Sequence, residues 1–403
     1  MDYNIKPMIH RFQQNGMNIV MDVNSGIVHV VDDVTYKVLA YYNGTNRDMV
    51  LANLSNDYDT AELNEVMDDL DDLIKKQVLF APMDPNYKMA IEDRPIIKAL
   101  CINIAHDCNL RCKYCFAGQG GYGKWRMLMS FDVARRGVDF LIAHSGPREH
   151  CELDFFGGEP LMNWHVVQQT VDYVHKQEKK HHKKIKMSLT TNGMLLDKEK
   201  VKYLTDNHIS LILSLDGRKE MHDRMRPGVH GEGTYDQIVK NLQYCVAHRN
   251  GEEYYVRGTF TKYNLDFTTD VEDMLDKGFP AVSMEPVVGE DTAEYSIKEE
   301  DLPRVKKEYD KLAKLFIRRE EEGRPFFFFH FNMDLWKGPC LPKRLRGCGA
   351  GHEYLAVVPN GDIYPCHQFV GRDGYVIGNV YEGLKNMKMM HDFRMNHVFS
   401  KPE

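Results

Sequence analysis

The sequence lacks several features that would place a protein in a membrane, in a secretory pathway or on nucleic acid. No apolar run is long enough to cross a bilayer, and the N-terminus MDYNIKPMIHRF has no signal-peptide pattern. Positive charge is not in excess, because 52 Lys and Arg stand against 59 Asp and Glu, which argues against a nucleic-acid-binding protein. With 403 residues, 43% of them hydrophobic, we expect a soluble, cytoplasmic protein of roughly two or three domains.

The nine cysteines are not the even set expected of a secreted disulfide framework. Six of them fall into two groups, one near residue 110 and one near the C-terminus: Cys108, Cys112, Cys115, Cys340, Cys348 and Cys366. Clustered cysteines in a reducing compartment indicate metal or redox chemistry.

The N-terminal segment has the pattern of a small domain. Two short apolar runs at 19–23 and 27–31 flank an Asn-Ser-Gly turn, which predicts a β-hairpin. A helix capped by Asp32 or Asp33 is expected to follow and to continue to Tyr41.

A second helix and a closing strand are expected after this hairpin. From Leu63 to Ile74 the apolar residues recur at helical spacing and the positions between them are acidic, which predicts an amphipathic helix with a solvated face. Residues 78–80 are expected to add a short strand. Together these elements predict a winged-helix domain over residues 1–80, followed by a proline-containing linker over residues 81–96.

Residues 97–315 alternate short apolar runs with helix-length segments, one of which begins at Ser130, a good N-cap. Six such units predict parallel strands with right-handed crossovers. Six strands are fewer than the eight of a closed TIM barrel, so the expected fold class is α/β with an open, partial (β/α)6 barrel. The predicted strands are 99–104, 153–156, 186–190, 209–214, 254–260 and 281–285.

Two tracts in this part of the chain have an unusual composition. Residues 175–186 are rich in His and Lys, and we predict a solvated helix end and loop in preference to a metal site. Residues 326–329 are four consecutive phenylalanines, which predict a core strand or a wall between domains in preference to a cofactor site.

The sharpest chemical signal is the spacing of Cys108, Cys112 and Cys115 just after the first predicted barrel strand. Three thiolates on one loop can hold three irons of a [4Fe–4S] cube, whose fully protein-bound form needs four cysteines. The missing ligand leaves one iron open to bind a small molecule. A structural zinc site or inert cysteines are the alternatives, but zinc usually takes four ligands, often as paired C-x2-C units.

This C-x3-C-x2-C triplet resembles that of the radical S-adenosylmethionine (SAM) enzymes. The resemblance implies that the open iron chelates the amino and carboxylate groups of SAM, and that Tyr114 lies against the adenine. It also implies that the reduced cluster gives an electron to the sulfonium, and that the resulting 5′-deoxyadenosyl radical abstracts a hydrogen. Iron–sulfur potentials can reach roughly −700 mV, so a strongly reducing cluster is physically available.

Further segments match this family in the expected order along the chain. The Gly-Gly-Glu-Pro turn after the second strand implies contact with the SAM amino group, by close backbone approach and by hydrogen bonds to the carboxylate. Polar residues ending the third and fourth strands resemble the contacts to ribose and carboxylate. Arg257 resembles a partner of the SAM carboxylate, with a structural ion pair as the alternative. The implied SAM-binding residues are Tyr114, Gly157, Gly158, Glu159, Pro160, Thr191, Asn192, Ser214, Asp216 and Arg257.

An HD-x-x-RP stretch from His222 to Pro227 is shared with one large subgroup of the family. These sites all cluster at the C-terminal ends of the predicted strands, where barrel chemistry is placed.

The C-terminal cysteines resemble the opening motif of SPASM domains, in which such residues ligate an auxiliary [4Fe–4S] cluster and Gly361 makes the intervening turn. The implied ligands are Cys340, Cys348 and Cys366. A complete SPASM domain continues with further cysteines, which the sequence up to residue 403 does not contain. We therefore expect a bridging region and a truncated SPASM domain within residues 316–403. The fourth ligand of the auxiliary cluster stays open, and a substrate thiolate is one hypothesis.

The N-terminal domain indicates which subgroup of the radical SAM enzymes this sequence resembles. A winged helix ahead of a radical SAM barrel resembles the leader-peptide recognition element of peptide-modifying enzymes, in which an extended leader adds a strand to the sheet edge. The stretch MIHRFQQNGMNIVMDVNSGIVHVVDDVTYKVL resembles the start of maturases for six-cysteine SCIFF peptides, which link a cysteine sulfur to a backbone α-carbon as a thioether (sactionine). The implied partners are a cysteine-rich precursor peptide with its leader and a low-potential electron donor such as ferredoxin or flavodoxin.

The residues that assist with acid–base chemistry are left open. His367, which directly follows Cys366, and Glu285 on the sixth strand are the candidates, with a purely structural role as the alternative for each. Two other functions also remain open. One is a sulfatase-maturing radical SAM enzyme that oxidises Cys or Ser to formylglycine, and the other is a non-catalytic peptide-binding remnant.

Overall fold

The computed structural model describes residues 8–83, 96–123, 126–332 and 345–400, which form two units. The first unit contains Met1–Arg94, Met333–Gly347 and Met395–Glu403, and the second contains Pro95–Asn332 and Cys348–Arg394. The expected domain boundaries stay predictions. No helix in the described segments is both long and apolar enough to span a membrane.

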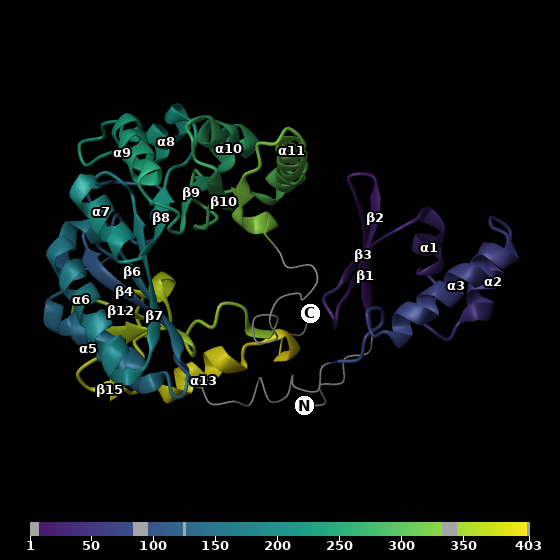
Figure 1. The fold of residues 1–403 in the computed structure, drawn as a ribbon, viewed down its shortest axis with the longest axis horizontal. Coiled ribbons are helices and arrows are strands. Elements are labelled where there is room, and N and C mark those ends of the chain that lie inside the picture. Colours follow the sequence, from purple (N-terminus) through teal and green to yellow (C-terminus); the bar gives the residue numbers. More distant parts are fainter. Residues whose placement is uncertain (1–7, 84–95, 124–125, 333–344, 401–403) are drawn as a thin grey trace. The chain divides into compact units, whose positions relative to one another are not determined.

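The N-terminal unit contains a three-stranded antiparallel sheet in the order β1-β2-β3 (Figure 1). Its strands are β1 Ile9–Gln14, β2 Met17–Asp22 and β3 Val28–Val31. The predicted hairpin is formed by β2 and β3, and Gly26, at a φ of +76°, completes its turn. β1 was not predicted, because its residues IHRFQQ are mostly polar and mostly exposed.

Three helices cover one face of this sheet: α1 Asp33–Val38, α2 Arg47–Leu54 and α3 Thr60–Lys75. The Asp32 side chain caps α1 by accepting a hydrogen bond from the backbone N–H of Thr35, as predicted. The predicted strand at 78–80 is wrong. Leu79 is buried in the domain core without a strand partner, and Phe80 has a φ of +47°, which a strand does not allow.

The second unit is built on parallel strands, and all six predicted strands are present. They are β4 Ala99–His106, β6 His150–Gly157, β7 Lys184–Thr191, β8 Ser210–Ser214, β9 Tyr254–Phe260 and β10 Ala281–Pro286. The order β10-β9-β8-β7-β6-β4 follows the chain, so the partial barrel is confirmed. The sheet is nevertheless longer than predicted, because β11 (Phe327–Phe328) pairs with β10 and β12 (Tyr354–Val357) pairs with β4, both in parallel. The phenylalanine run thus contributes a short strand.

Helices cover the outer side of these strands (Figure 1). They are α5 Phe131–His144, α6 Trp164–His181, α7 Lys198–Asp206, α8 Lys219–Met225, α9 Tyr235–Ala247, α10 Phe267–Asp276 and α11 Leu302–Glu321. The Ser130 side chain caps α5, as predicted. The His/Lys-rich tract covers the end of α6 and the start of β7, and His182 ends the helix in the left-handed region at a φ of +53°.

The C-terminal residues extend the same sheet with short antiparallel strands beyond β12. The remaining elements are β5 Met127–Leu128, β13 Asp362–Tyr364, β14 Gly378–Asn379, β15 Gly383–Leu384 and α13 Met387–Met395. One 3-10 helix, Pro160–Asn163, starts at the Gly-Gly-Glu-Pro turn, and another is His367–Phe369. Direct pairing of β12 with β4 brings the C-terminal region onto the barrel edge that carries the cysteine triplet.

Candidate functional site

The cysteine loop follows β4 directly and is held in place by the HD-x-x-RP stretch. The backbone N–H of Arg111 donates to the Pro227 carbonyl, and that of Lys113 donates to the Met225 carbonyl, both at 2.8 Å. An isolated bridge between Leu110 and Gly228 continues this pairing. The HD-x-x-RP stretch, which was predicted only to mark a subgroup, is therefore the structural support of the triplet.

The three thiols of this loop are free, and those of Cys108 and Cys112 pack against the barrel core. Burial raises the pKa of Cys108 to about 12 and that of Cys112 to about 11. Cys108 Sγ also receives the backbone N–H of Leu110 at 3.4 Å and the Asn192 amide at 3.6 Å. Iron binding would release the thiol protons, and N–H groups directed at sulfur stabilise the bound thiolates.

A buried cation lies beside these thiols. Arg226 is 7% exposed, its Nη1 donates to the Tyr114 hydroxyl at 3.0 Å, and it lies 3.7 Å from Asp216. Its charge favours the thiolate of Cys112 and so opposes the burial that raises the pKa of this thiol. Among the described residues, the buried Arg226 Nε has no hydrogen-bond partner. An orphaned buried donor and positive charge beside three thiols fit an anionic iron–sulfur cluster.

The described residues contain no group of three His, Cys, Asp or Glu side chains gathered around one point as the ligands of a single metal ion are.

The Tyr114 hydroxyl donates to Asp216 Oδ2 at 2.6 Å. Asp216 Oδ1 accepts a hydrogen bond from the backbone N–H of Thr259 at 3.1 Å, and the residue is only 1% exposed. Each carboxylate oxygen of Asp216 thus accepts one hydrogen bond within the protein, and the expected contact of Asp216 with SAM stays a prediction. Asp216 instead fixes the tyrosine that the resemblance places against adenine.

The two glycines of the Gly-Gly-Glu-Pro turn are required by close backbone packing. A Cβ on Gly157 would lie 2.3 Å from the Ala105 carbonyl oxygen, and one on Gly158 would lie 2.1 Å from the Asp107 carbonyl oxygen. The turn is joined to the start of the cysteine loop by hydrogen bonds from the backbone N–H groups of Gly158 and Glu159 to the same two carbonyls. The positions of this turn and of the cysteine loop are therefore coupled.

The Glu159 carboxylate is completely buried and accepts three hydrogen bonds from the protein. Its donors are the Thr191 hydroxyl and the Asn192 backbone N–H, both at 2.8 Å, and the Leu161 backbone N–H at 3.0 Å. Burial raises the pKa of this carboxyl group to about 7. These hydrogen bonds make the carboxylate a link between two loops, and its expected contact with the SAM amino group stays a prediction.

The remaining predicted contacts lie at the ends of β8 and β9. Ser214 is paired with Arg257 in the sheet, and Arg257 Nε lies 3.7 Å from Glu285. The Arg257 side chain is 46% exposed and lines a cavity inside the barrel. Arg257 thus forms the structural ion pair that was considered as the alternative, with Glu285 as its partner. Its side chain also lines the cavity.

The two acid–base candidates have different surroundings. Glu285 accepts a hydrogen bond from Ser283 and lies 3.2 Å from His330, which lowers its pKa to about 2. It is therefore ionised and a poor proton donor. The ring of His367 packs 5.5 Å from Phe116, and burial lowers its pKa to about 4.

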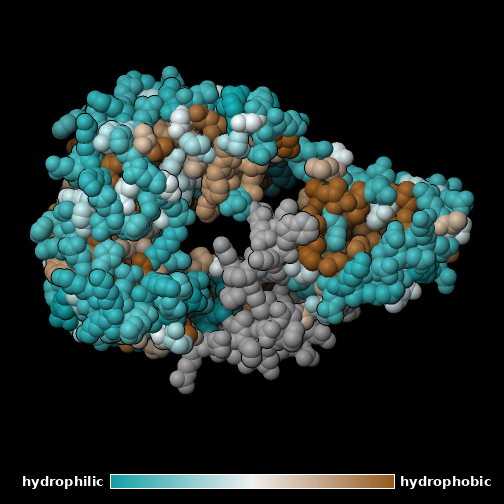
Figure 2. All heavy atoms as spheres, in the orientation of Figure 1, coloured by the Kyte–Doolittle hydropathy of each residue, from teal (hydrophilic) through white to brown (hydrophobic). Residues whose placement is uncertain are grey.

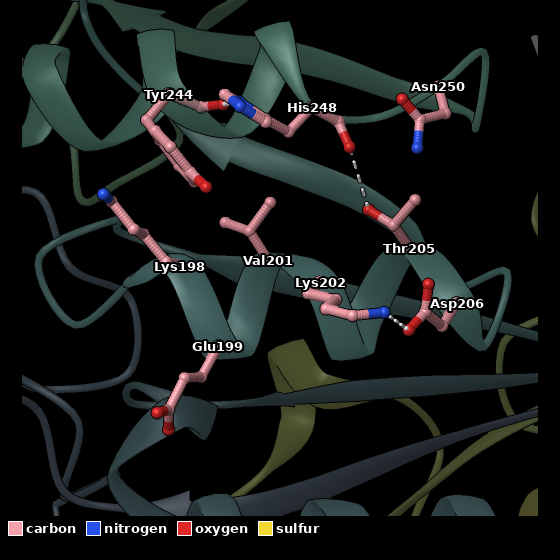
Figure 3. Close-up of a pocket in the computed structure, with 9 residues that line it drawn as sticks. All are labelled: Lys198, Glu199, Val201, Lys202, Thr205, Asp206, Tyr244, His248 and Asn250. Atoms are coloured by element: carbon pink, nitrogen blue, oxygen red, sulfur yellow. Dashed lines mark hydrogen bonds and ion pairs between the residues drawn. The ribbon is translucent and has the colours of Figure 1, made fainter.

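The barrel interior contains a cavity of about 410 Å³, which we call the lumen cavity. Alternate residues of β6, β7, β8 and β9 line it, together with Phe329, Tyr354 and His367. Two residues of this cavity, Asp154 and Ser188, were not predicted. They lie on neighbouring strands and are joined by a hydrogen bond. The polar–apolar alternation in ELDFF does mark Asp154 as facing away from the hydrophobic core. Figure 3 shows a different groove of about 430 Å³, between α7 and the end of α9, which contains none of the predicted site residues.

The C-terminal cysteines are only partly described, because Cys340 lies outside the described residues. Cys348 is exposed, while Cys366 is buried and its pKa is raised by burial and by the nearby Cys348. Between them, Gly361 at a φ of +89° makes the turn between β12 and β13, and β14 pairs with β13. The expected turn is thus present.

Comparison with known proteins agrees with this geometry. Residues 102–259 match the Radical SAM superfamily, and residues 348–402 match SPASM, an iron–sulfur cluster-binding domain. The fold and the site define a radical SAM enzyme. Residues 102–259 thus form a radical SAM domain, which binds a [4Fe–4S] cluster and SAM, and residues 348–402 form a SPASM domain, which binds auxiliary iron–sulfur clusters.

Three relatives illustrate the range of similar proteins. The radical SAM cyclopropyl synthase TigE of Paramaledivibacter caminithermalis is 23% identical over 62% of this chain, which spans 56% of TigE. The cysteine-type anaerobic sulfatase-maturating enzyme of Clostridium perfringens strain 13 is 24% identical over 76% of this chain and 83% of its own. The structure of Streptococcus suis SuiB bound to its precursor peptide SuiA has a TM-score of 0.55 and 16% identity, covering 96% of this chain and 89% of SuiB.

Proposed function

We propose that this protein is a peptide maturase that forms thioether (sactionine) cross-links, from a cysteine sulfur to a backbone α-carbon, in a ribosomally made cysteine-rich precursor. The observation that supports it most directly is the presence of a sheet-and-helix unit before the radical SAM barrel in one chain. Because that unit resembles the start of SCIFF maturases, we infer that the substrate is a cysteine-rich precursor peptide. SuiB, whose fold is similar, binds a precursor peptide.

The N-terminal sheet offers the surface that a leader peptide needs. β1 and β3 are the two edge strands of this three-stranded sheet. Its face away from the helices carries exposed apolar side chains, including Phe12, Met17 and Val30, and Figure 2 shows hydrophobic residues gathered over this sheet. An added strand would gain main-chain hydrogen bonds from an edge and specificity from such side chains.

The barrel residues would then position the chemistry. When bound, the cluster and SAM supply a hydrogen-abstracting 5′-deoxyadenosyl radical. Cys108, Cys112 and Cys115 would hold the cluster, the glycine turn would approach SAM through its backbone, and the lumen cavity would receive the core peptide. Electrons would come from a low-potential ferredoxin or flavodoxin, and an auxiliary cluster at Cys348 and Cys366, with Cys340, would accept the electron released on bond formation.

The test is anaerobic incubation of the reconstituted protein with SAM, a reductant and a cysteine-rich precursor peptide that has its leader. Each thioether removes two hydrogens and one free thiol without adding oxygen, and mass spectrometry with thiol counting detects both changes. Tandem fragmentation then locates the modified α-carbon. A peptide that consumes SAM but keeps its mass and its thiols would contradict the proposal.

A sulfatase-maturing function is the second candidate, because the HD-x-x-RP stretch and the similarity to the C. perfringens enzyme favour it. The same assay with a sulfatase peptide would then convert a cysteine to formylglycine, which replaces sulfur with oxygen. A non-catalytic remnant would bind the leader and release no 5′-deoxyadenosine.

A further inference from the structure

The lumen cavity contains a carboxylate to which no role has been given so far. Asp154 is on β6, and its Oδ1 accepts a hydrogen bond from the Ser188 hydroxyl on β7 at 2.7 Å. Both side chains line the lumen cavity. A second hydroxyl, that of Tyr354 on β12, lines the same cavity, lowers the pKa of Asp154 and lies 3.2 Å from His367 Nδ1.

The surroundings of this carboxylate are largely aromatic. Phe156, Tyr255 and Phe329 line the same cavity, and the rings of Tyr255 and Phe329 stack at 5.4 Å. Burial raises the pKa of Asp154, and the Ser188 and Tyr354 hydroxyls only partly oppose this rise. An acidic group that is partly desolvated but still faces a cavity is suited to take up a proton there. The titratable groups that act on it or are affected by it are Glu152, Cys101, Tyr255 and Tyr354. The cavity is also lined by Lys186, Glu253, Arg257 and His367.

We propose that Asp154 is the general base that accepts the proton of the substrate cysteine thiol as the carbon–sulfur bond forms. This assignment rests on the proposed thioether-forming function. The S–H bond breaks and its proton passes to the Asp154 carboxylate. The hydrogen atom of the acceptor α-carbon would go to the 5′-deoxyadenosyl group, and the sulfur would bond to that carbon. The one remaining electron would pass to an oxidised auxiliary iron–sulfur cluster, which the C-terminal cysteines would hold.

The base is needed because a free thiol is a poor partner for this step. A cysteine of ordinary pKa, about 8.5, is only about 3% thiolate at pH 7 and about 76% thiolate at pH 9. Hydrogen abstraction from the α-carbon does not involve the thiol proton. Loss of the base should therefore leave SAM cleavage in place and reduce the number of thioethers formed for each 5′-deoxyadenosine.

The experiment compares wild-type protein with Asp154→Asn and with Asp206→Asn, a matched control on the exposed outer side of α7. Thioether and 5′-deoxyadenosine are both quantified with the cysteine-rich precursor peptide. At pH 7, D154N should keep 5′-deoxyadenosine formation within threefold of wild type and lower the thioether yield per 5′-deoxyadenosine at least tenfold. At pH 9 this deficit should shrink to about threefold or less, since the thiol then ionises without help. D206N should match wild type at both pH values.

Other outcomes separate the two proposals. If wild-type protein forms no thioether, the proposed function fails and the role of Asp154 fails with it. If wild type forms thioethers and D154N has the same yield per 5′-deoxyadenosine, only the role of Asp154 is overturned. A deficit that is equal at pH 7 and pH 9 overturns it as well, because it would show a positioning role. Asp154→Glu keeps a carboxylate and should restore the wild-type yield of thioether per 5′-deoxyadenosine. If D154N does not fold, Asp154→Ser takes its place as the variant without a carboxylate.

Discussion

The Glu159 carboxylate accepts a hydrogen bond from the Thr191 hydroxyl at 2.8 Å, although 32 residues separate them in the chain. The contact joins the turn after β6 to the end of β7, and the Asn192 N–H extends it to the turn after β7, in a buried setting. Since the turn after β6 also donates backbone hydrogen bonds to the start of the cysteine loop, three loops at the C-terminal end of the barrel share one network.

Glu159→Gln should weaken this network. The glutamine amide would direct N–H groups at donors that now face carboxylate oxygens, and an unsatisfied buried polar group costs about 1–3 kcal/mol. Urea denaturation of the metal-free protein should show a loss of that size, and SAM should bind more weakly to the reconstituted protein. Glu62→Gln, on the exposed face of α3, is the control and should change neither quantity. Equal stability of E159Q and wild type would refute the role of Glu159 as a link.

Gly158→Ala tests the coupling between the glycine turn and the cysteine loop. The added Cβ would meet the Asp107 carbonyl oxygen at 2.1 Å, so the residue next to Cys108 must move. We expect reconstituted G158A to lose most of the iron and absorbance of the SAM-binding cluster. Gly137→Ala in α5, whose Cβ would make only ordinary van der Waals contacts with Ile102 and Leu100 of β4, should retain both. Wild-type iron content in G158A would show that the cysteine loop tolerates the displacement.

Strands with a clear local pattern of apolar residues could be predicted from the sequence. Strand pairings between residues far apart in the chain could not. The six barrel strands are buried apolar runs, and each was found. The pairing of β12 with β4 joins residues about 250 positions apart and leaves no local pattern. The strand predicted at 78–80 shows that an apolar run can also mislead. Leu79 is apolar because it fills the domain core, and it belongs to no strand.

The same distinction holds at the site. The cysteine spacing and the glycine turn are local patterns, and they predicted which loops meet. The roles of Asp216, Glu159 and Arg226 depend on which buried partner each side chain finds, so they required the structure.

Asn192→Ala should change the electronic properties of the cluster without removing it. The Asn192 amide lies 3.6 Å from Cys108 Sγ, and N–H groups directed at cysteine sulfur raise the reduction potential of an iron–sulfur cluster. Redox titration followed by electron paramagnetic resonance should show a more negative potential with unchanged iron content. Asn53→Ala, on exposed α2, serves as the control. A potential identical to that of wild type would mean that this amide does not act on the cluster.

Single cysteine substitutions should separate the two cluster sites. Cys112→Ala should abolish 5′-deoxyadenosine formation, because two thiolates cannot hold the cube in place, while Cys366→Ala should remove only auxiliary iron. Cys245→Ala, at a buried position on α9, should keep the full iron content. Iron analysis and the visible spectrum of each anaerobic protein provide the comparison. Continued 5′-deoxyadenosine production by C112A would refute the assignment of the triplet.

Glu285→Gln should reduce stability in a pH-dependent manner. The neighbouring His330, Ser283 and Arg257 lower the pKa of Glu285 from 4.5 to about 2, so the folded protein favours the ionised carboxylate more than the unfolded chain does. The resulting stabilisation is fully present well above pH 4.5 and is lost as the pH falls towards 2. We expect E285Q to unfold with about 1–3 kcal/mol less free energy at pH 7, and the difference from wild type should be smaller at pH 4. Urea denaturation at both pH values measures it. A deficit that grows as the pH falls would have the wrong sign and would exclude an ionised Glu285 in the folded protein.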